Sequence, residues 1–192
     1  MKETKNIIIC GVGGQGTLLA SKLIGHVCQN GGYDVKLSEV HGMSQRGGSV
    51  ISYVRYGEAV ASPVIDMGEA DVILAFELLE AARYLPYLKK SGLMILNDQQ
   101  INPVPVITGA AGYPSDLAGK LKSHPIDVID VDALKLAKEA GSAKAVNVVL
   151  IGILAKRMEF AKDDWLKAIE ETVPEKFREM NLKAFESGFA LA

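Results

Sequence analysis

A glycine-rich turn near the start of the chain could bind an anionic group. Gly11, Gly13 and Gly16 follow a short apolar run and precede a segment whose apolar residues recur at helical spacing. In this context the first glycine permits a tight turn, the second lets the backbone approach a bound group, and the third lets the helix pack on the strand. The N-terminus of such a helix suits a phosphate or carboxylate. The candidate anion-binding residues are Gly11, Gly13, Gly14, Gln15 and Gly16.

The same turn is typical of proteins that bind nicotinamide or flavin dinucleotides. Those proteins usually place an acidic residue at the end of the second strand, about twenty residues further on, to hold the ribose. Glu39 lies near that distance, but it opens a polar loop, so the match is imperfect. A free-standing NAD(P)- or FAD-binding protein is therefore one alternative. Glycines that only shape the passage from strand to helix are another.

A second candidate site is the polar, glycine-rich segment from residue 39 to residue 48. The guanidinium of Arg46, which is flanked by small and polar residues, could grip a carboxylate or phosphate through two parallel hydrogen bonds. His41 could donate, accept or carry charge near neutral pH, and Glu39 could orient either side chain. A solvated loop without a ligand is the simpler alternative. The candidate loop residues are Glu39, His41, Met43, Gln45, Arg46, Gly47 and Gly48.

Composition narrows the classes of function. Hydrophobic residues make up 48% of the chain and charged residues 23%, and the net charge is -2, which favours a globular protein that binds neither nucleic acid nor a membrane surface. The apolar stretch from Ile7 to Cys10 is too short for a signal peptide or a membrane span, so we expect a cytoplasmic protein. Two cysteines are too few for an iron–sulfur cluster, and the three histidines show no metal-ligand spacing. We expect this chain alone to bind no metal or cofactor.

The pattern of strands and helices predicts an α/β fold over residues 1–192. We expect one domain with a three-layer, doubly wound, Rossmann-like sheet that is mostly parallel, with an inserted β-hairpin and a helical C-terminal tail from about residue 145. The hairpin would pair 49–56 with 59–61, and 102–108, which has two prolines, would be extended at an edge. The expected strands are 6–10, 33–40, 49–56, 70–76, 93–96 and 127–131, and the expected helices begin at 17, 77, 113, 133 and 145.

The glycine turn and the polar loop together resemble the gamma-type domain of the 2-oxoacid:ferredoxin oxidoreductases. The similarity extends from residue 6 to about residue 155, and the block from His41 to Gly48 is its most specific part. That block favours the branch that acts on arylpyruvates such as indolepyruvate, while the pyruvate branch or another 2-oxoacid branch is an alternative. The segments that carry the resemblance are 11–16, 38–50, 62–63, 69–72, 76–77, 80–81, 84–88 and 147–152.

The resemblance implies a subunit of a complex that oxidatively decarboxylates a 2-oxoacid to an acyl-CoA. Thiamine diphosphate, Mg²⁺ and iron–sulfur clusters would lie on a larger partner chain and pass electrons to ferredoxin, with CoA as co-substrate. This chain has neither a Gly-Asp-Gly segment of the thiamine type nor four cysteines, so we expect no catalytic residue within it and no activity alone. The 39–48 loop would face the partner, exclude water, and position substrate or CoA through Arg46 and His41. Whether the isolated chain forms a homodimer is left open.

Overall fold

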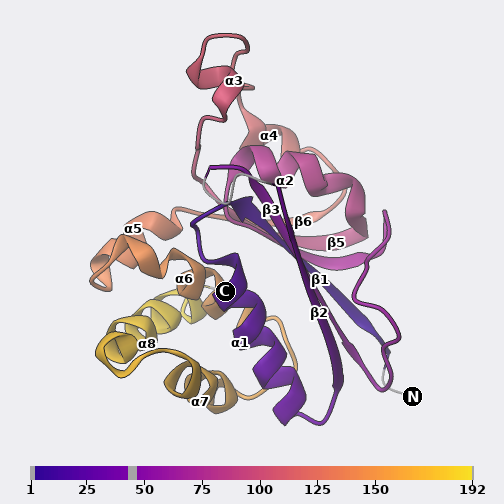
Figure 1. The fold of residues 1–192 in the computed structure, drawn as a ribbon, viewed down its shortest axis with the longest axis vertical. Coiled ribbons are helices and arrows are strands. Elements are labelled where there is room, and N and C mark those ends of the chain that lie inside the picture. The colour runs from indigo at the N-terminus through magenta and orange to yellow at the C-terminus, as the bar shows by residue number, and fades with distance from the viewer. Residues whose placement is uncertain (1–2, 43–46, 192) are drawn as a thin grey trace.

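A six-stranded sheet forms the centre of the computed structural model, which describes residues 3–42 and 47–191 (Figure 1). The strand order is β2-β3-β1-β4-β5-β6. Strands β1, β4, β5 and β6 are parallel to one another, whereas β3 is antiparallel to both β1 and β2. The carboxyl ends of all strands except β3 therefore lie at one edge of the sheet. The strands are β1 (Lys5–Val12), β2 (Asp34–His41), β3 (Ser49–Gly57), β4 (Ala70–Ala75), β5 (Leu88–Asn97) and β6 (Asp127–Val131).

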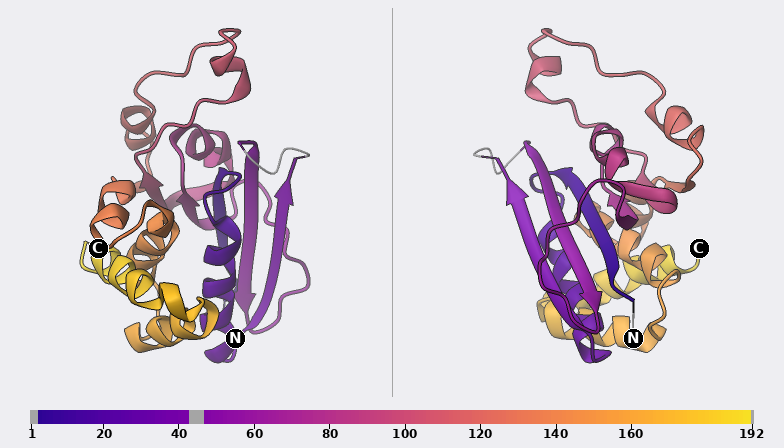
Figure 2. Two further views of the ribbon diagram at one scale, coloured as in Figure 1. Left: turned by 60° about the vertical axis from the view of Figure 1, so that its left-hand side comes forward. Right: turned by 90° about the vertical axis from the view of Figure 1, so that its right-hand side faces the viewer.

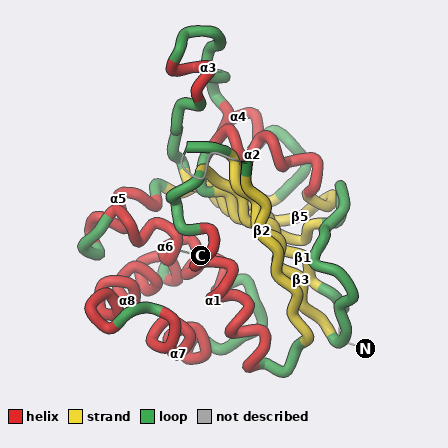
Figure 3. Tube along the Cα trace, in the orientation of Figure 1, coloured by secondary structure: helices red, strands yellow, loops and turns green. Residues whose placement is uncertain are grey.

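Helices cover both faces of the sheet and make it the middle of three layers (Figures 1 and 2). One face carries the larger group: α1 (Thr17–Asn30), α5 (Ala133–Glu139), α6 (Val146–Ala155), α7 (Lys162–Thr172) and α8 (Glu175–Phe189). The other face carries α2 (Leu78–Tyr84) and α4 (Leu117–Lys122). Short 3-10 turns lie at Leu85–Tyr87 and Ala143–Ala145. Helix α3 (Val104–Ile107) lies on a loop that projects from the body (Figure 3).

The sheet has a hydrophobic cluster on each of its two faces, and the central strands contribute apolar side chains to both. Ile7 and Ile9 of β1 point into the cluster under α1 and α6, whereas Ile8 points into the cluster under α2. A strand buried on both faces has no need of polar alternation, which explains the continuous apolar run in β1. Helix α6 is buried along its whole length, and it separates the sheet from α8.

The expected class is confirmed: the chain is a mostly parallel, Rossmann-like α/β domain with helices on both faces. The helical tail is also present, as α6, α7 and α8, and its breaks fall near Ala161 and Pro174 as expected. No helix among the described residues is long and apolar enough to cross a membrane.

The expected hairpin partner of β3 is wrong. The segment 59–61 forms no strand, because β3 is already paired along one side with β1 and along the other with β2. The segment that follows β3 is held instead by hydrogen bonds from a side chain of that strand. Nη1 of Arg55 donates to the backbone oxygens of Ser62 and Val64, at 3.0 and 2.9 Å. Strand β3 thus lies between β2 and β1 and is antiparallel to both of them.

The expected extended edge at 102–108 is also wrong. Residues Val104–Ile107 form the short helix α3, with Pro103 as its N-cap and Pro105 in its first turn. A proline is tolerated there because the first backbone N–H groups of a helix have no partner within the helix. Alternate prolines therefore fit the start of a helix as well as they fit an edge strand.

Candidate functional site

The glycine turn joins β1 to α1 at the carboxyl edge of the sheet. Its backbone needs glycine at two positions, since φ is +103° at Gly14 and +86° at Gly16. The side chain of Gln15 folds back onto the turn: Oε1 accepts from the backbone N–H of Val12 at 2.7 Å, and Nε2 donates to the backbone oxygen of Phe76 at 2.9 Å. Gln15 thus fixes the turn to the end of β4, and its amide is engaged within the chain.

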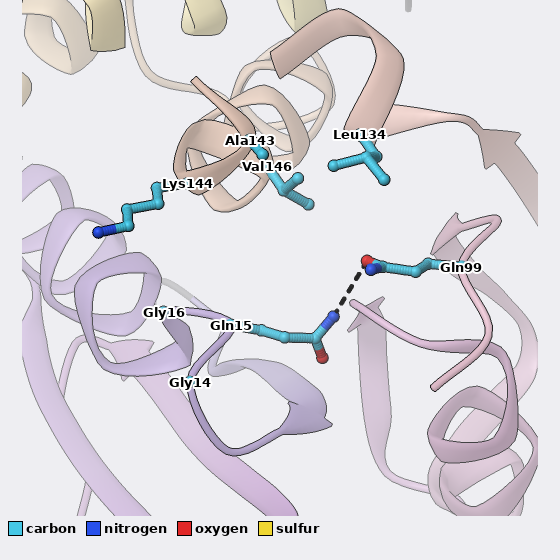
Figure 4. Close-up of a pocket in the computed structure, with 8 residues that line it drawn as sticks. All are labelled: Gly14, Gln15, Gly16, Gln99, Leu134, Ala143, Lys144 and Val146. Atoms are coloured by element: carbon cyan, nitrogen blue, oxygen red, sulfur yellow. Dashed lines mark hydrogen bonds between the residues drawn. The ribbon is translucent and has the colours of Figure 1, made fainter. Parts of the chain in front are cut away.

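A partly buried amide network extends from Gln15 across the ends of the central strands, and Figure 4 shows its bond between Gln15 and Gln99. Gln15 donates to Oε1 of Gln99 at 3.3 Å, and Nδ2 of Asn97 donates to the same atom at 3.0 Å. Oδ1 of Asn97 in turn accepts from the backbone N–H of Ala133, at the start of α5, at 3.1 Å. The network therefore holds the ends of β1, β4 and β5 and the start of α5 in one arrangement.

This edge is a topological switch point. The connection after β1 enters α1 on one face of the sheet, whereas the connection after the neighbouring β4 enters α2 on the other face. In open α/β sheets, the crevice at such a point is where ligands bind. The glycine turn therefore lies at the place where the fold itself predicts a ligand.

Two hollows flank the glycine turn. The first has a volume of about 430 Å³ and is the one in Figure 4, where Lys144 and Gln99 approach the turn from opposite sides. The second has a volume of about 450 Å³ and is lined by Glu39 and His41. Among the described residues, the lining of the first hollow includes a lysine and no acidic residue, whereas the lining of the second includes the carboxylate of Glu39. Charge therefore favours an anion in the first hollow.

The two sequence-predicted sites are brought together. The backbone N–H of Gly13 donates to the oxygen of Gly48 at 2.8 Å, and the N–H of Gly47 donates to the oxygen of Gly13 at 3.3 Å. Oε2 of Glu39 accepts from the hydroxyl of Thr17 at 3.3 Å and from that of Ser52 at 3.0 Å. Glu39 thus connects the end of β2 to the first turn of α1 and to β3.

The remaining loop residues contribute differently. His41 is exposed at the end of β2, with Nδ1 3.1 Å from the oxygen of Gly42. Met43, Gln45 and Arg46 lie outside the described residues.

Several residues of this region could not be assigned to the site from sequence motifs alone. Asn147 is buried, and Nδ2 donates to the oxygen of Gly16 at 3.3 Å. Gln99 and Lys144 line the first hollow. Gln99 could have been found from its place just after a buried strand at the carboxyl edge. Lys144 carries no such signal, because a lone lysine between two helices is typical of solvated surface.

A second polar cluster lies beside the turn, under α2. Glu77 is 1% exposed; Oε2 accepts from the N–H of Glu80 at 2.9 Å, and Oε1 accepts from the N–H of Ile101 at 3.0 Å and from the hydroxyl of Tyr113. Burial, and then the bond to Glu77, raise the pKa of Tyr113, so its hydroxyl keeps its proton. Glu80 accepts from the hydroxyl of Ser49 and pairs with Arg83. Both carboxylates are satisfied by partners that cap and fasten helix α2.

The described residues offer no group of three or more His, Cys, Asp or Glu side chains that could hold a metal ion. Cys10 and Cys28 are both buried, and burial raises the pKa of each thiol. This donor set does not fit an iron–sulfur cluster, nor a Mg²⁺ ion that would anchor a diphosphate.

The fold and the glycine turn at its switch point define a Rossmann-like α/β domain. The family model described as pyruvate ferredoxin/flavodoxin oxidoreductase matches residues 6–191, and the chain belongs to this family. It is 46% identical to the indolepyruvate oxidoreductase subunit IorB of Thermococcus kodakarensis, over 100% of this chain and 97% of the relative. The corresponding subunit of Archaeoglobus fulgidus is 43% identical, over 96% and 93%.

Among the more distant relatives, this chain matches part of a longer protein in one case and nearly all of a gamma subunit in another. The ketoisovalerate oxidoreductase subunit VorA of Methanothermobacter marburgensis is 27% identical over 94% of this chain, but the match covers 35% of that longer relative. Among solved structures, the gamma subunit of a keto/oxoacid ferredoxin oxidoreductase from Geobacter sulfurreducens superimposes with a TM-score of 0.75 at 26% identity, over 97% of this chain and 96% of that one.

Proposed function

We propose that this chain is the small subunit of a ferredoxin-dependent 2-oxoacid oxidoreductase that acts on indolepyruvate or a related arylpyruvate. The observation that carries the proposal is the 46% and 43% identity, over nearly the full chain, to two archaeal indolepyruvate oxidoreductase subunits. Identity falls to 27% for the ketoisovalerate relative. The free-standing dinucleotide enzyme and the other 2-oxoacid branches are not favoured by these comparisons.

The reaction needs groups that lie on a larger partner chain in this proposal. There thiamine diphosphate with Mg²⁺ would carry the decarboxylation, and iron–sulfur clusters would pass the electrons to ferredoxin. The donor set of the described residues fits neither group, so no step of the reaction is assigned to a side chain of this chain. The complex is proposed to be cytoplasmic.

The contribution of this chain is a shaped polar surface at the carboxyl edge of its sheet. Gly47 and Gly48, which lead into β3, are hydrogen-bonded to Gly13 of the glycine turn, and Glu39 near the end of β2 is hydrogen-bonded to Thr17 of α1. Docked on the partner, this surface would exclude water from a reactive intermediate. Lys144 beside the first hollow, with His41 and Arg46 on the loop, would attract an anionic group of the substrate or CoA.

A substrate panel on the reconstituted complex tests the proposal. The two chains are co-expressed, and CoA-dependent ferredoxin reduction is measured with indolepyruvate, phenylpyruvate, pyruvate and 2-oxoisovalerate. We expect the arylpyruvates to give the highest kcat/KM. A higher kcat/KM for pyruvate or 2-oxoisovalerate would contradict the substrate class.

The loop role is tested separately with an Arg46→Ala version of this chain in the same complex. We expect weaker coupling of ferredoxin reduction to CoA. Wild-type rates and wild-type CoA dependence would show that the loop has no role in the active site.

A further inference from the structure

The segment between β5 and α4 projects from the body of the molecule (Figures 1 and 2). It leaves the carboxyl end of β5, the edge that also carries the glycine turn, and it holds the short helix α3 near its far end. None of the residues from 98 to 116 is buried. We call the part from 102 to 112 the arm.

The base of the arm is fastened to α2 at both ends. On the outgoing side, the N–H of Ile101 donates to Oε1 of Glu77 at 3.0 Å, and the oxygen of Gln99 accepts from the N–H of Leu78 at 3.0 Å. On the returning side, the hydroxyl of Tyr113 donates to the same Oε1 and accepts from the N–H of Leu79 at 3.1 Å. A single buried carboxylate therefore holds the two ends of the arm together.

The tip of the arm has its own hydrogen bonds. The N–H of Ala111 donates to the oxygen of Pro105 at 3.0 Å, and the hydroxyl of Thr108 donates to the oxygen of Val104 at 3.0 Å. The tip of the arm is thus held in shape by hydrogen bonds within the arm. Such a preformed element loses little conformational freedom when it binds.

The side chains of the arm are those of an interface. No charged residue occurs from Gln99 to Ser115, although charged residues make up 23% of the chain. Val104 is 69% exposed and Ile107 is 71% exposed. Depletion of charge combined with exposed apolar side chains is what distinguishes the centre of a protein–protein interface from solvated surface.

We propose that the arm is the docking element of this subunit, and that Val104 and Ile107 enter an uncharged, apolar pocket on the larger partner chain. The inference rests on the proposed function, which supplies the partner. Two observations select this occupant. The arm leaves the same edge of the sheet as the polar surface of this chain that we propose to dock on the partner, so one partner chain can reach both. The ketoisovalerate relative contains this domain within a longer chain, and in such a chain the domain has further polypeptide against which to pack.

The test uses the co-expressed complex with the larger chain tagged. The double variant Val104→Ser/Ile107→Ser replaces two exposed side chains, so the fold should not depend on it, and thermal unfolding of the isolated variant checks this. The matched control is Met67→Ser, which is also 69% exposed but lies before the amino end of β4. The dissociation constant of the complex is measured by dilution and mass photometry.

We expect the double variant to raise the dissociation constant at least about tenfold, as for central interface residues, while Met67→Ser leaves it unchanged. A double variant that forms the complex with the wild-type dissociation constant overturns the arm as docking element, while the proposed function stands. If the double variant instead abolishes self-association of the isolated chain and spares the complex, the arm binds a second copy and the inference is wrong. If the wild-type chain does not associate with the larger chain, the proposed function itself has failed.

Discussion

Nδ2 of Asn147 donates a hydrogen bond to the backbone oxygen of Gly16 at 3.3 Å, and so joins the start of α6 to the start of α1. Gly16 lines the first hollow, as does Val146, the residue before Asn147. Helix α6 is buried throughout, so it acts as a rigid reference for the glycine turn. The shape of the turn therefore depends on a residue more than a hundred positions away.

The first prediction concerns glycines within the turn. Both Gly14 and Gly16 have a positive φ, which disfavours any side chain. A Cβ at Gly16 would in addition lie 2.6 Å from Nδ2 of Asn147, whereas a Cβ at Gly14 would meet nothing within 4 Å. We expect Gly16→Ala to lower the free energy of unfolding by about 2–4 kcal/mol and Gly14→Ala by about 1–2 kcal/mol, the cost of the backbone conformation alone. Denaturant unfolding measures both. Equal losses would show that Asn147 does not constrain the turn.

The second prediction concerns the hydroxyl of Tyr113. Tyr113→Phe removes a donor to the buried carboxylate of Glu77 and an acceptor for the N–H of Leu79. We expect a loss of about 1–3 kcal/mol in the free energy of unfolding, because a buried polar group is left with one partner fewer. Limited proteolysis should also cut the arm faster. Ser115→Ala, at an exposed neighbouring position, is the control and should change neither quantity.

Much of the architecture follows from local patterns, and the exceptions have physical causes. The apolar run in β1 and the helical spacing after Gly16 predict the first strand and helix, because both patterns depend only on burial. The pairing of β3 depends on which strands already occupy its edges, and no local pattern near 59–61 reports that.

The residues of the candidate site also fall into those that the sequence predicts and those that it does not. The glycine turn and Glu39 could be predicted because turn chemistry requires those residue types at that spacing. The roles of Asn147, Gln99 and Lys144 depend on contacts between distant segments. The arm shows the same limit: its lack of charge is visible in the sequence, but its projection from the body is not.

The third prediction concerns the two cysteines. Burial raises the pKa of Cys10, assisted by the charges of Glu80 and Glu77, and burial also raises the pKa of Cys28. At pH 8 a free cysteine with a pKa of about 8.5 is roughly one quarter thiolate, whereas a raised pKa keeps the thiol protonated and unreactive. We expect neither cysteine to react with a thiol reagent at pH 8 in the native protein, and both to react once it is unfolded. Fast labelling of the native protein would contradict the burial of these thiols.

The fourth prediction concerns Lys144. In the assembled complex, Lys144→Gln removes the positive charge that Lys144 brings to the lining of the first hollow. We expect the KM for CoA to rise about threefold to tenfold, with kcat little changed, and the difference to shrink at high salt as screening increases. Lys120→Gln, on α4 at the opposite face of the sheet, is the charge-matched control. An unchanged KM would show that no anionic group of CoA is attracted there.

Turnover by the isolated chain, compared with the assembled complex, tests the central claim most directly. The account predicts no oxidation of any 2-oxoacid and no stoichiometric binding of thiamine diphosphate by the purified chain, and indolepyruvate-dependent ferredoxin reduction once the larger chain is added. Unaided turnover, or one equivalent of thiamine diphosphate bound by this chain in calorimetry, would contradict it.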